Sequence, residues 1–176
     1  MMRATFPVLE TERLTLRGPV PADAQTFMDF YKTDRSHMAG GPLAETLSWR
    51  AFAADFGHWA IHGFGRFFVT RRGEDRPIGL AGPYAPLGWP EKEIGWVLFD
   101  AANEGKGYAT EAARACVAYA WRTLKWPTIV SYIDPENSAS IALAKRLGAT
   151  LDATATPPKP GVPCHVYRHL RPEALA

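Results

Sequence analysis

One stretch of the sequence decides the fold: Glu93-Ile-Gly-Trp-Val-Leu-Phe99 and, shortly after it, Glu104-Gly-Lys-Gly-Tyr-Ala-Thr-Glu-Ala112. The first segment contains β-branched and aromatic residues, which predicts a strand. Gly105 and Gly107 then predict a tight turn, and the alanine-rich run that follows predicts a helix to about Leu124. The stretch therefore encodes a strand, a glycine turn and the start of a helix.

This glycine turn has the features of a phosphate site. The first N–H groups of a helix have no partner within the helix, and the helix dipole adds partial positive charge there. Gly105 and Gly107 leave room for an anion to reach these groups, and Lys106 can add a point charge. The glycines also have a purely structural explanation, because short glycine motifs often do no more than form a turn.

This turn departs from two well-known nucleotide-binding motifs. The sequence contains no G-x-x-x-x-G-K-[ST] string, which excludes a P-loop. A dinucleotide motif requires Gly or Ala where Thr110 stands, although Asp134 can take the place of the ribose-binding acid. A small nucleotide-binding oxidoreductase is therefore an alternative interpretation of the turn.

The rest of the chain predicts an α+β (mixed α/β) fold. Alternating or β-branched runs predict strands over 11–17, 66–71, 78–84, 128–134, 150–155 and 164–170. Apolar stripes predict helices over 21–31 and 44–61, and Asn137 is the expected N-cap of a helix ending at Gly148. The stripe expected for the 44–61 helix consists of Trp49, Phe52, Ala53, Phe56 and Ala60. One mixed sheet with helices on both faces accommodates this order of elements.

Composition narrows the class of protein. The 176 residues favour one domain over 1–176, and 20 Lys+Arg against 18 Asp+Glu give no electrostatic reason to expect nucleic acid or a membrane as partner. Apolar runs such as Ala115–Trp121 are too short to span a bilayer, and Met1–Leu9 lacks an apolar signal core. Cys116 and Cys164 form no disulfide framework, and the histidines show no metal-ligand spacing. We therefore expect a cytoplasmic protein without a metal.

Three separated motifs resemble the GNAT N-acetyltransferase superfamily. They are E-I-G-W-V-L (93–98), E-G-K-G-Y-A-T-E-A (104–112) and N-S-A-S-I-A-L-A-K-R-L-G-A (137–149). The opening L-E-T-E-R-L-T-L-R (9–17) is similar to the branch of ribosomal-protein N-terminal acetyltransferases, the RimJ/RimL type. The resemblance implies the GNAT acyl-CoA N-acyltransferase fold, with a largely antiparallel sheet and a motif-bearing core over about 9–170.

The resemblance also implies acetyl-CoA as the donor. Its diphosphate would bind the turn residues Gly105, Lys106, Gly107, Tyr108, Ala109 and Thr110. Its pantetheine arm would pair with the strand at Val97, Leu98 and Phe99, and Asn137 would bind the pantetheine or the substrate side. Glu104 departs from the Gln or Arg that opens the family's phosphate loop, which places an acid beside the expected phosphates.

Two residues match catalytic positions of the family. Glu93 is the expected general base, which requires burial to raise its pKa, and its alternative role is an exposed residue at the start of a strand. Many relatives carry a tyrosine as general acid where this chain has Ala144. Ser140 is the nearest hydroxyl on the same helix and is the expected proton donor, or else only a support for the first helical turn.

These observations predict an N-acetyltransferase that moves an acetyl group from acetyl-CoA directly to a primary amine. The amine belongs to a small molecule or to a protein N-terminus, and family members often form homodimers. A GNAT-fold module that binds acyl-CoA without turnover is the main alternative. Proline-rich loops over 83–90 and 157–163 are expected to border the acceptor cleft.

Overall fold

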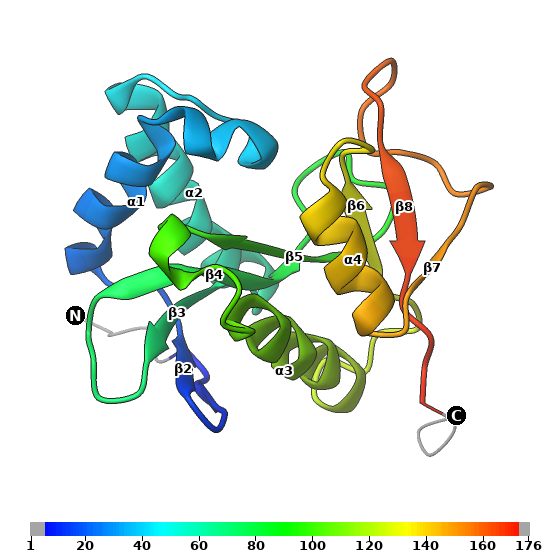
Figure 1. The fold of residues 1–176 in the computed structure, drawn as a ribbon, viewed down its shortest axis with the longest axis horizontal. Helices are drawn as coiled ribbons and strands as arrows, with labels where there is room; N and C mark the ends of the chain where they lie inside the picture. The colour runs from blue at the N-terminus through cyan, green and yellow to red at the C-terminus, as the bar shows by residue number, and fades with distance from the viewer. Residues whose placement is uncertain (1–5, 173–176) are drawn as a thin grey trace.

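The computed structural model of the protein describes residues 6–172, so the start of the Met1–Leu9 segment lies outside the described residues. One eight-stranded sheet organises the chain, in the order β1-β2-β3-β4-β5-β6-β8-β7 (Figure 1). The strands are β1 (Leu9–Glu10), β2 (Leu14–Arg17), β3 (Phe67–Arg71), β4 (Pro77–Tyr84), β5 (Glu93–Leu98), β6 (Val130–Ile133), β7 (Thr150–Leu151) and β8 (His165–Arg168). Among the strand pairs within residues 6–172, only β5–β6 is parallel, which confirms a mixed, largely antiparallel sheet.

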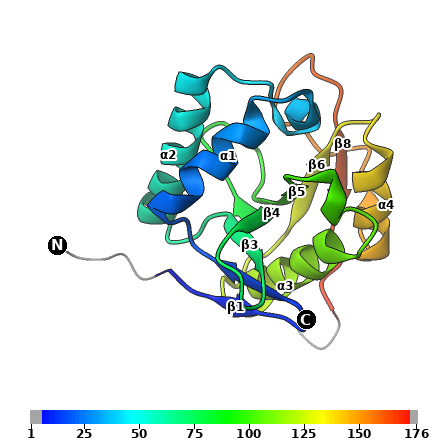
Figure 2. The ribbon, with the colours of Figure 1, turned by 60° about the vertical axis from the view of Figure 1, so that its left-hand side comes forward.

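Helices cover both faces of this sheet, as Figure 2 shows. They are α1 (Ala24–Tyr31), α2 (Glu45–His62), α3 (Tyr108–Arg122) and α4 (Ser138–Arg146), with 3-10 helices η1 (Pro21–Asp23), η2 (Asp34–Ala39) and η3 (Ala101–Asn103). Neighbouring strand residues point to opposite faces, so Phe67 packs with α3 whereas Phe68 packs with α1 and α2. The predicted α+β architecture is confirmed.

Some element boundaries differ from the sequence prediction. The strand expected over 11–17 is divided by a tight turn in which the Thr11 N–H donates to the Leu14 carbonyl at 2.9 Å. The strand expected over 150–155 ends at Leu151, because the Asp152 carboxylate accepts a hydrogen bond from the Thr154 N–H and turns the chain. The helix expected from the glycine turn begins only at Tyr108.

The stripe predicted for α2 was only partly right, because Phe52 is buried and Phe56 packs against the core, whereas Ala60 is exposed. Trp49 is 57% exposed, whereas α2 buries Phe52, Asp55, His58 and Trp59. Asp55 and His58 are inside because both have hydrogen-bond partners there, which a hydrophobic pattern does not reveal.

The sheet opens between β5 and β6. The two strands are paired only where Glu93 faces Val130, and beyond that point they diverge. On its other edge β5 pairs with β4 along its whole length, from Glu93 to Leu98. The opening lies at the centre of the sheet, with α3 and α4 on one side and α1, α2 and η2 on the other (Figure 1).

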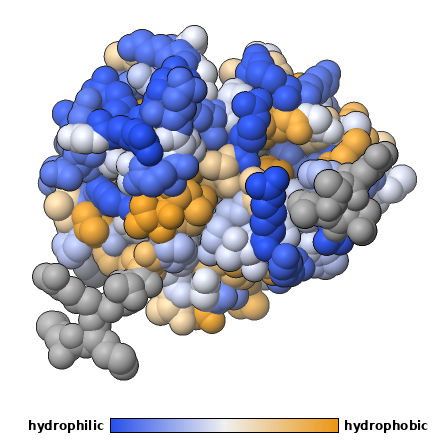
Figure 3. Space-filling model, turned by 90° about the horizontal axis from the view of Figure 1, so that it is seen from below, coloured by the Kyte–Doolittle hydropathy of each residue, from blue (hydrophilic) through white to orange (hydrophobic). Residues whose placement is uncertain are grey.

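The surface seen in Figure 3 is mostly hydrophilic, and its hydrophobic residues form small separate patches. A large continuous apolar area is a common mark of a protein interface. No such continuous area is visible on this face of the described residues.

Candidate active site

A cavity of about 1430 Å³ occupies the opening between β5 and β6. Two sets of residues line it. The first, called here the glycine side, consists of Gly105, Gly107, Tyr108, Ala109, Thr110, Asn137 and Ser140. The second, called the Glu93 side, consists of Tyr31, Met38, Arg66, Tyr84, Trp89 and Glu93. The sheet opening therefore joins the two sides in one continuous space.

The backbone of the glycine turn is free to bind an anion. Gly105 and Gly107 have positive φ angles of 70° and 82°, which side chains disfavour. No described residue accepts a hydrogen bond from the backbone N–H groups between Gly105 and Thr110. A Cβ atom at Gly105 would meet nothing within 4 Å, so the turn is open to the cavity. Free N–H groups at the start of α3 make a cradle for a negatively charged group.

The segment at the start of the chain braces this turn. Glu111, in the first turn of α3, accepts hydrogen bonds from Thr11 Oγ1 at 2.6 Å and from the Arg13 backbone N–H at 2.9 Å. The Arg13 guanidinium group also pairs with Glu111 and donates to the Lys106 carbonyl at 2.9 Å. Burial opposes ionisation of Glu111, but these hydrogen bonds outweigh it and lower its pKa. Sequence reasoning missed this contact between two motifs that lie far apart in the chain.

The backbone of β5 presents hydrogen-bonding groups to the opening at Leu98. The Phe99 N–H donates to the Ile78 carbonyl on β4, and strand residues alternate in direction. The N–H and carbonyl groups of Trp96 and Leu98 therefore face away from β4, toward the opening. Of the strand residues predicted to bind the cofactor, Val97 and Leu98 line the cavity. Phe99 does not, because its ring packs against Phe30 in the core.

Lys106 also lies outside the cavity lining, although its neighbours on both sides line it. Its backbone carbonyl is held by Arg13 at the outer side of the turn. The positive charge that the sequence suggested at this position is therefore not directed into the cavity.

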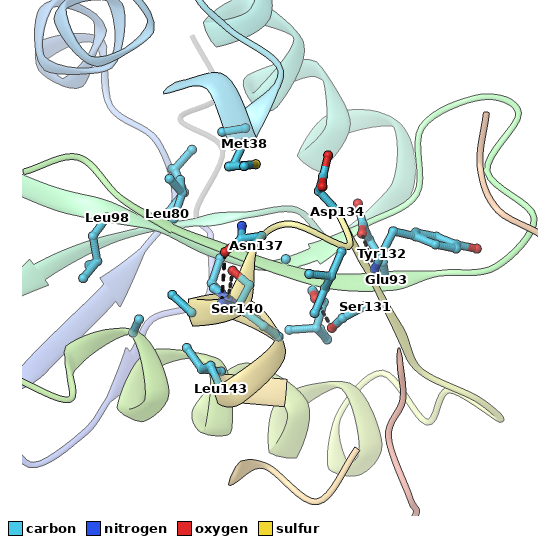
Figure 4. Close-up of a pocket in the computed structure, with 18 of the residues that line it drawn as sticks. Met38, Leu80, Glu93, Leu98, Ser131, Tyr132, Asp134, Asn137, Ser140 and Leu143 are labelled. Carbon is cyan, nitrogen blue, oxygen red and sulfur yellow. Dashed lines mark hydrogen bonds between the residues drawn. The ribbon is translucent and has the colours of Figure 1, made fainter. Parts of the chain in front are cut away.

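The start of α4 supplies three polar groups. Asn137 Oδ1 accepts a hydrogen bond from the Ser140 N–H at 3.0 Å, so the predicted N-cap is present. Its amide nitrogen has no partner among the described residues and lies at the opening (Figure 4). Trp96 Nε1 donates to Ser140 Oγ at 3.2 Å, which leaves the hydrogen of that hydroxyl available to another acceptor. Ala144 is fully buried and adds no polar group.

Glu93 is the main ionisable group on the opposite side. Its carboxylate accepts hydrogen bonds from Trp89 Nε1 at 3.1 Å and from the Tyr132 N–H at 3.4 Å. Burial raises the pKa of Glu93 to about 7, against the effect of these two hydrogen bonds. Glu93 is thus half-buried and directed into the cavity, and it is not the exposed strand residue considered above (Figure 4).

An ion pair supports the wall beside Glu93. Arg66 on the β3 side donates to both carboxylate oxygens of Asp55, at 2.9 and 2.8 Å. Its guanidinium group also lies 4.7 Å from the centre of the Tyr84 ring. Asp55 is 1% exposed, so this wall depends on a charge pair that is mostly shielded from water.

The described residues also bear on metal sites and membrane spans. Within residues 6–172, no group of three or more His, Cys, Asp and Glu side chains is arranged to hold a metal ion. None of the helices in that part of the chain is long and apolar enough to cross a membrane. Cys116 is fully buried in the core.

Comparison with known proteins identifies the class. A family model described as the acetyltransferase (GNAT) domain matches residues 13–150, and the chain therefore belongs to the GNAT acetyltransferase family. A crystal structure of an acetyltransferase from Agrobacterium tumefaciens is 38% identical, covers 97% of this chain and 98% of its own, and superposes with a TM-score of 0.88. The predicted family and fold are confirmed.

Other relatives are more distant or match only in part. An uncharacterised N-acetyltransferase of Bacillus subtilis, YnaD, is 37% identical over 83 residues, which are 47% of this chain and 48% of YnaD. The chain thus matches about half the length of this curated relative. RimL, a ribosomal L7/L12 α-N-protein acetyltransferase solved in complex with coenzyme A, shares the fold at 14% identity, with a TM-score of 0.73 over 93% of this chain and 98% of its own.

Proposed function

We propose that the protein transfers an acetyl group from acetyl-CoA to a primary amine. One observation carries the proposal. A single cavity joins an anion cradle at Gly105–Thr110 to a half-buried carboxylate, Glu93, whose pKa is about 7. The first group suits the diphosphate of a CoA thioester, and the second suits the removal of a proton from an amine.

The residues on the glycine side fit acetyl-CoA. The N–H groups from Gly105 to Thr110 would hold the diphosphate, and the outward-facing backbone of Leu98 would pair with the pantetheine arm. The free amide nitrogen of Asn137 would donate to the same arm. When bound, acetyl-CoA supplies the activated thioester. Val97 would contact the arm with its side chain, whereas Phe99 is engaged in the core.

The chain's own residues can move the protons that the reaction requires. The Glu93 carboxylate accepts a proton from the acceptor ammonium group, which leaves a neutral nitrogen able to attack the thioester carbon. The Trp96 N–H also faces the opening, closer to Glu93 along β5, and can donate to the acetyl oxygen as negative charge develops there. Ser140 can donate a hydrogen bond to the departing sulfur, since Trp96 already donates to its oxygen, and the proton that the sulfur takes up comes from solvent.

The acceptor is proposed to be a small-molecule amine or a protein N-terminus. The motif at 9–17 supports a place in the RimJ/RimL-like branch, although its contacts with Glu111 give it a structural role as well. Trp89, Tyr84 and Glu93 give the acceptor side aromatic and negative groups, which favour a cationic amine over an anionic acceptor.

A thiol-release assay over a panel of amines tests the function. Turnover with acetyl-CoA and at least one amine is the expected result. Calorimetry with acetyl-CoA, CoA and NAD(P) separates the alternatives. Binding of CoA without turnover on any amine would favour a non-catalytic acyl-CoA-binding module, and binding of NAD(P) alone would favour the oxidoreductase.

A further inference from the structure

One arginine, Arg35, contacts both the end of β5 and the residue that precedes the glycine turn. Arg35 lies on η2, the segment that also places Met38 at the rim of the Glu93 side. Its Nη2 donates to the Leu98 carbonyl at 3.3 Å, and its Nε donates to the Phe99 carbonyl at 3.1 Å. Arg35 also forms an ion pair with Glu104, the residue that precedes the glycine turn. Its guanidinium group therefore lies between the two parts of the proposed cofactor site, the end of β5 and the glycine turn.

We propose that Arg35, which lies at the rim of the glycine turn beside Glu104, is a further cofactor-binding residue that supplies positive charge for the diphosphate of acetyl-CoA. The inference rests on the function proposed above. It places the positive charge that faces the diphosphate on Arg35 of η2, the segment that also contributes to the Glu93 side, and not on Lys106 within the turn.

The local charges support this assignment. The free N–H groups of the turn favour an anion, whereas the Glu104 carboxylate beside them opposes one. Arg35 cancels that charge. A guanidinium group has donors on three nitrogens, and among the described residues only Nε and Nη2 of Arg35 have partners. Nη1 is thus available to a phosphate oxygen, and the side chain is 28% exposed and can turn toward a ligand.

The position of Arg35 also links the two substrates. The hydrogen bonds from Arg35 to the Leu98 and Phe99 carbonyls tie η2 to the end of β5, and η2 also carries Met38 at the rim of the Glu93 side. We therefore expect loss of Arg35 to raise the KM for the amine as well as for acetyl-CoA. A residue that bound only the diphosphate would raise the KM for acetyl-CoA and leave the KM for the amine unchanged.

The test is the dissociation constant of CoA, measured by calorimetry. Arg35→Ala is expected to weaken CoA binding about tenfold or more, and Arg35→Lys to restore part of the loss. Glu104→Gln is expected to tighten CoA binding, because it removes the opposing charge and releases the guanidinium group. Lys32→Ala is the matched control, since Lys32 is exposed at the end of α1 and lies outside the cavity lining.

The outcomes separate this inference from the proposed function. Wild-type affinity in Arg35→Ala, or a loss of affinity in Glu104→Gln equal to that in Arg35→Ala, would overturn the role of Arg35. The second result would show that the ion pair is needed only as a structural contact. If Arg35→Ala does not fold, Arg35→Lys and Glu104→Gln decide the matter by themselves. Failure of the wild-type protein to bind CoA would instead refute the proposed function.

Discussion

The glycine side and the Glu93 side of the cavity are built in different ways. Most of the glycine side comes from one continuous segment, the turn at 104–110, and it acts through backbone N–H groups. The Glu93 side combines side chains from α1, η2, β4, β5, the residue just before β3 and the loop before β5. A backbone site of this kind depends on local conformation, whereas a side-chain site depends on packing between distant elements. The experiments below test that difference.

Replacement of the proposed base should have the largest effect. Glu93→Gln is expected to lower kcat about 10²- to 10⁴-fold near neutral pH, because the amide cannot accept the proton of the amine. CoA affinity should remain at the wild-type value, since Glu93 lies across the cavity from the glycine turn. Steady-state kinetics and calorimetry measure the two quantities. Glu136→Gln, an exposed carboxylate near the cavity, is the control.

Loss of the buried Asp55–Arg66 ion pair should destabilise the protein. Asp55→Ala leaves the Arg66 guanidinium without its partner and is expected to lower the free energy of unfolding by about 3–5 kcal/mol. Chemical denaturation measures this value. Glu74→Ala breaks an exposed pair with Arg71 and should cost less than about 1 kcal/mol. Equal costs for the two variants would mean that the Asp55–Arg66 pair does not support the wall.

A strained backbone should weaken the glycine side without changing its side chains. Gly105→Ala forces alanine to adopt a φ near 70°, at about 1–2 kcal/mol of stability. It is also expected to weaken CoA binding about tenfold, because the strain is relieved by moving the N–H groups out of position. Gly73→Ala introduces the same strain in the hairpin between β3 and β4, where φ is 78° and no atom lies within 4 Å. Comparable loss of CoA affinity in both would contradict a local effect.

The hydrogen bond from Trp89 should have the smallest effect. Trp89 Nε1 stabilises the ionised form of Glu93, so Trp89→Phe is expected to raise the pKa of that carboxyl further, by about one pH unit. Wild-type activity should rise with pH through about 7 as the carboxylate forms, and the midpoint should move to higher pH in the variant. A pH–rate profile measures both midpoints. An unchanged midpoint in Trp89→Phe would show that the hydrogen bond from Trp89 does not affect the pKa of Glu93.

Sequence reasoning predicted the elements better than their inward faces. The strand at 93–99, the turn at Gly105 and Gly107 and the N-cap at Asn137 were predicted from patterns a few residues long. The buried face of α2 was predicted only in part, because Asp55 and His58 are polar and their partners lie outside this helix. Periodicity places apolar residues, but it does not show which polar residues have partners.

The candidate site divides in the same way. The cradle at Gly105–Thr110 was visible in the sequence because the conformation of one turn fixes the direction of its N–H groups. Two contacts between distant residues had no signal in the sequence. One is the bond from Arg13 to Glu111, and the other is the pairing of Arg35 with Glu104. Charged residues of both kinds are common along the chain, so only folding selects which of them meet.

The sequence by itself determined the family, the order of the elements and the glycine turn, because local conformation follows from neighbouring residues. The tertiary structure alone decided that β5 and β6 separate after Glu93 and that Phe99 is core. It also decided that the Glu93 carboxyl has a pKa of about 7. These properties depend on burial, and burial is set by elements that are distant in the chain and packed together only in the fold.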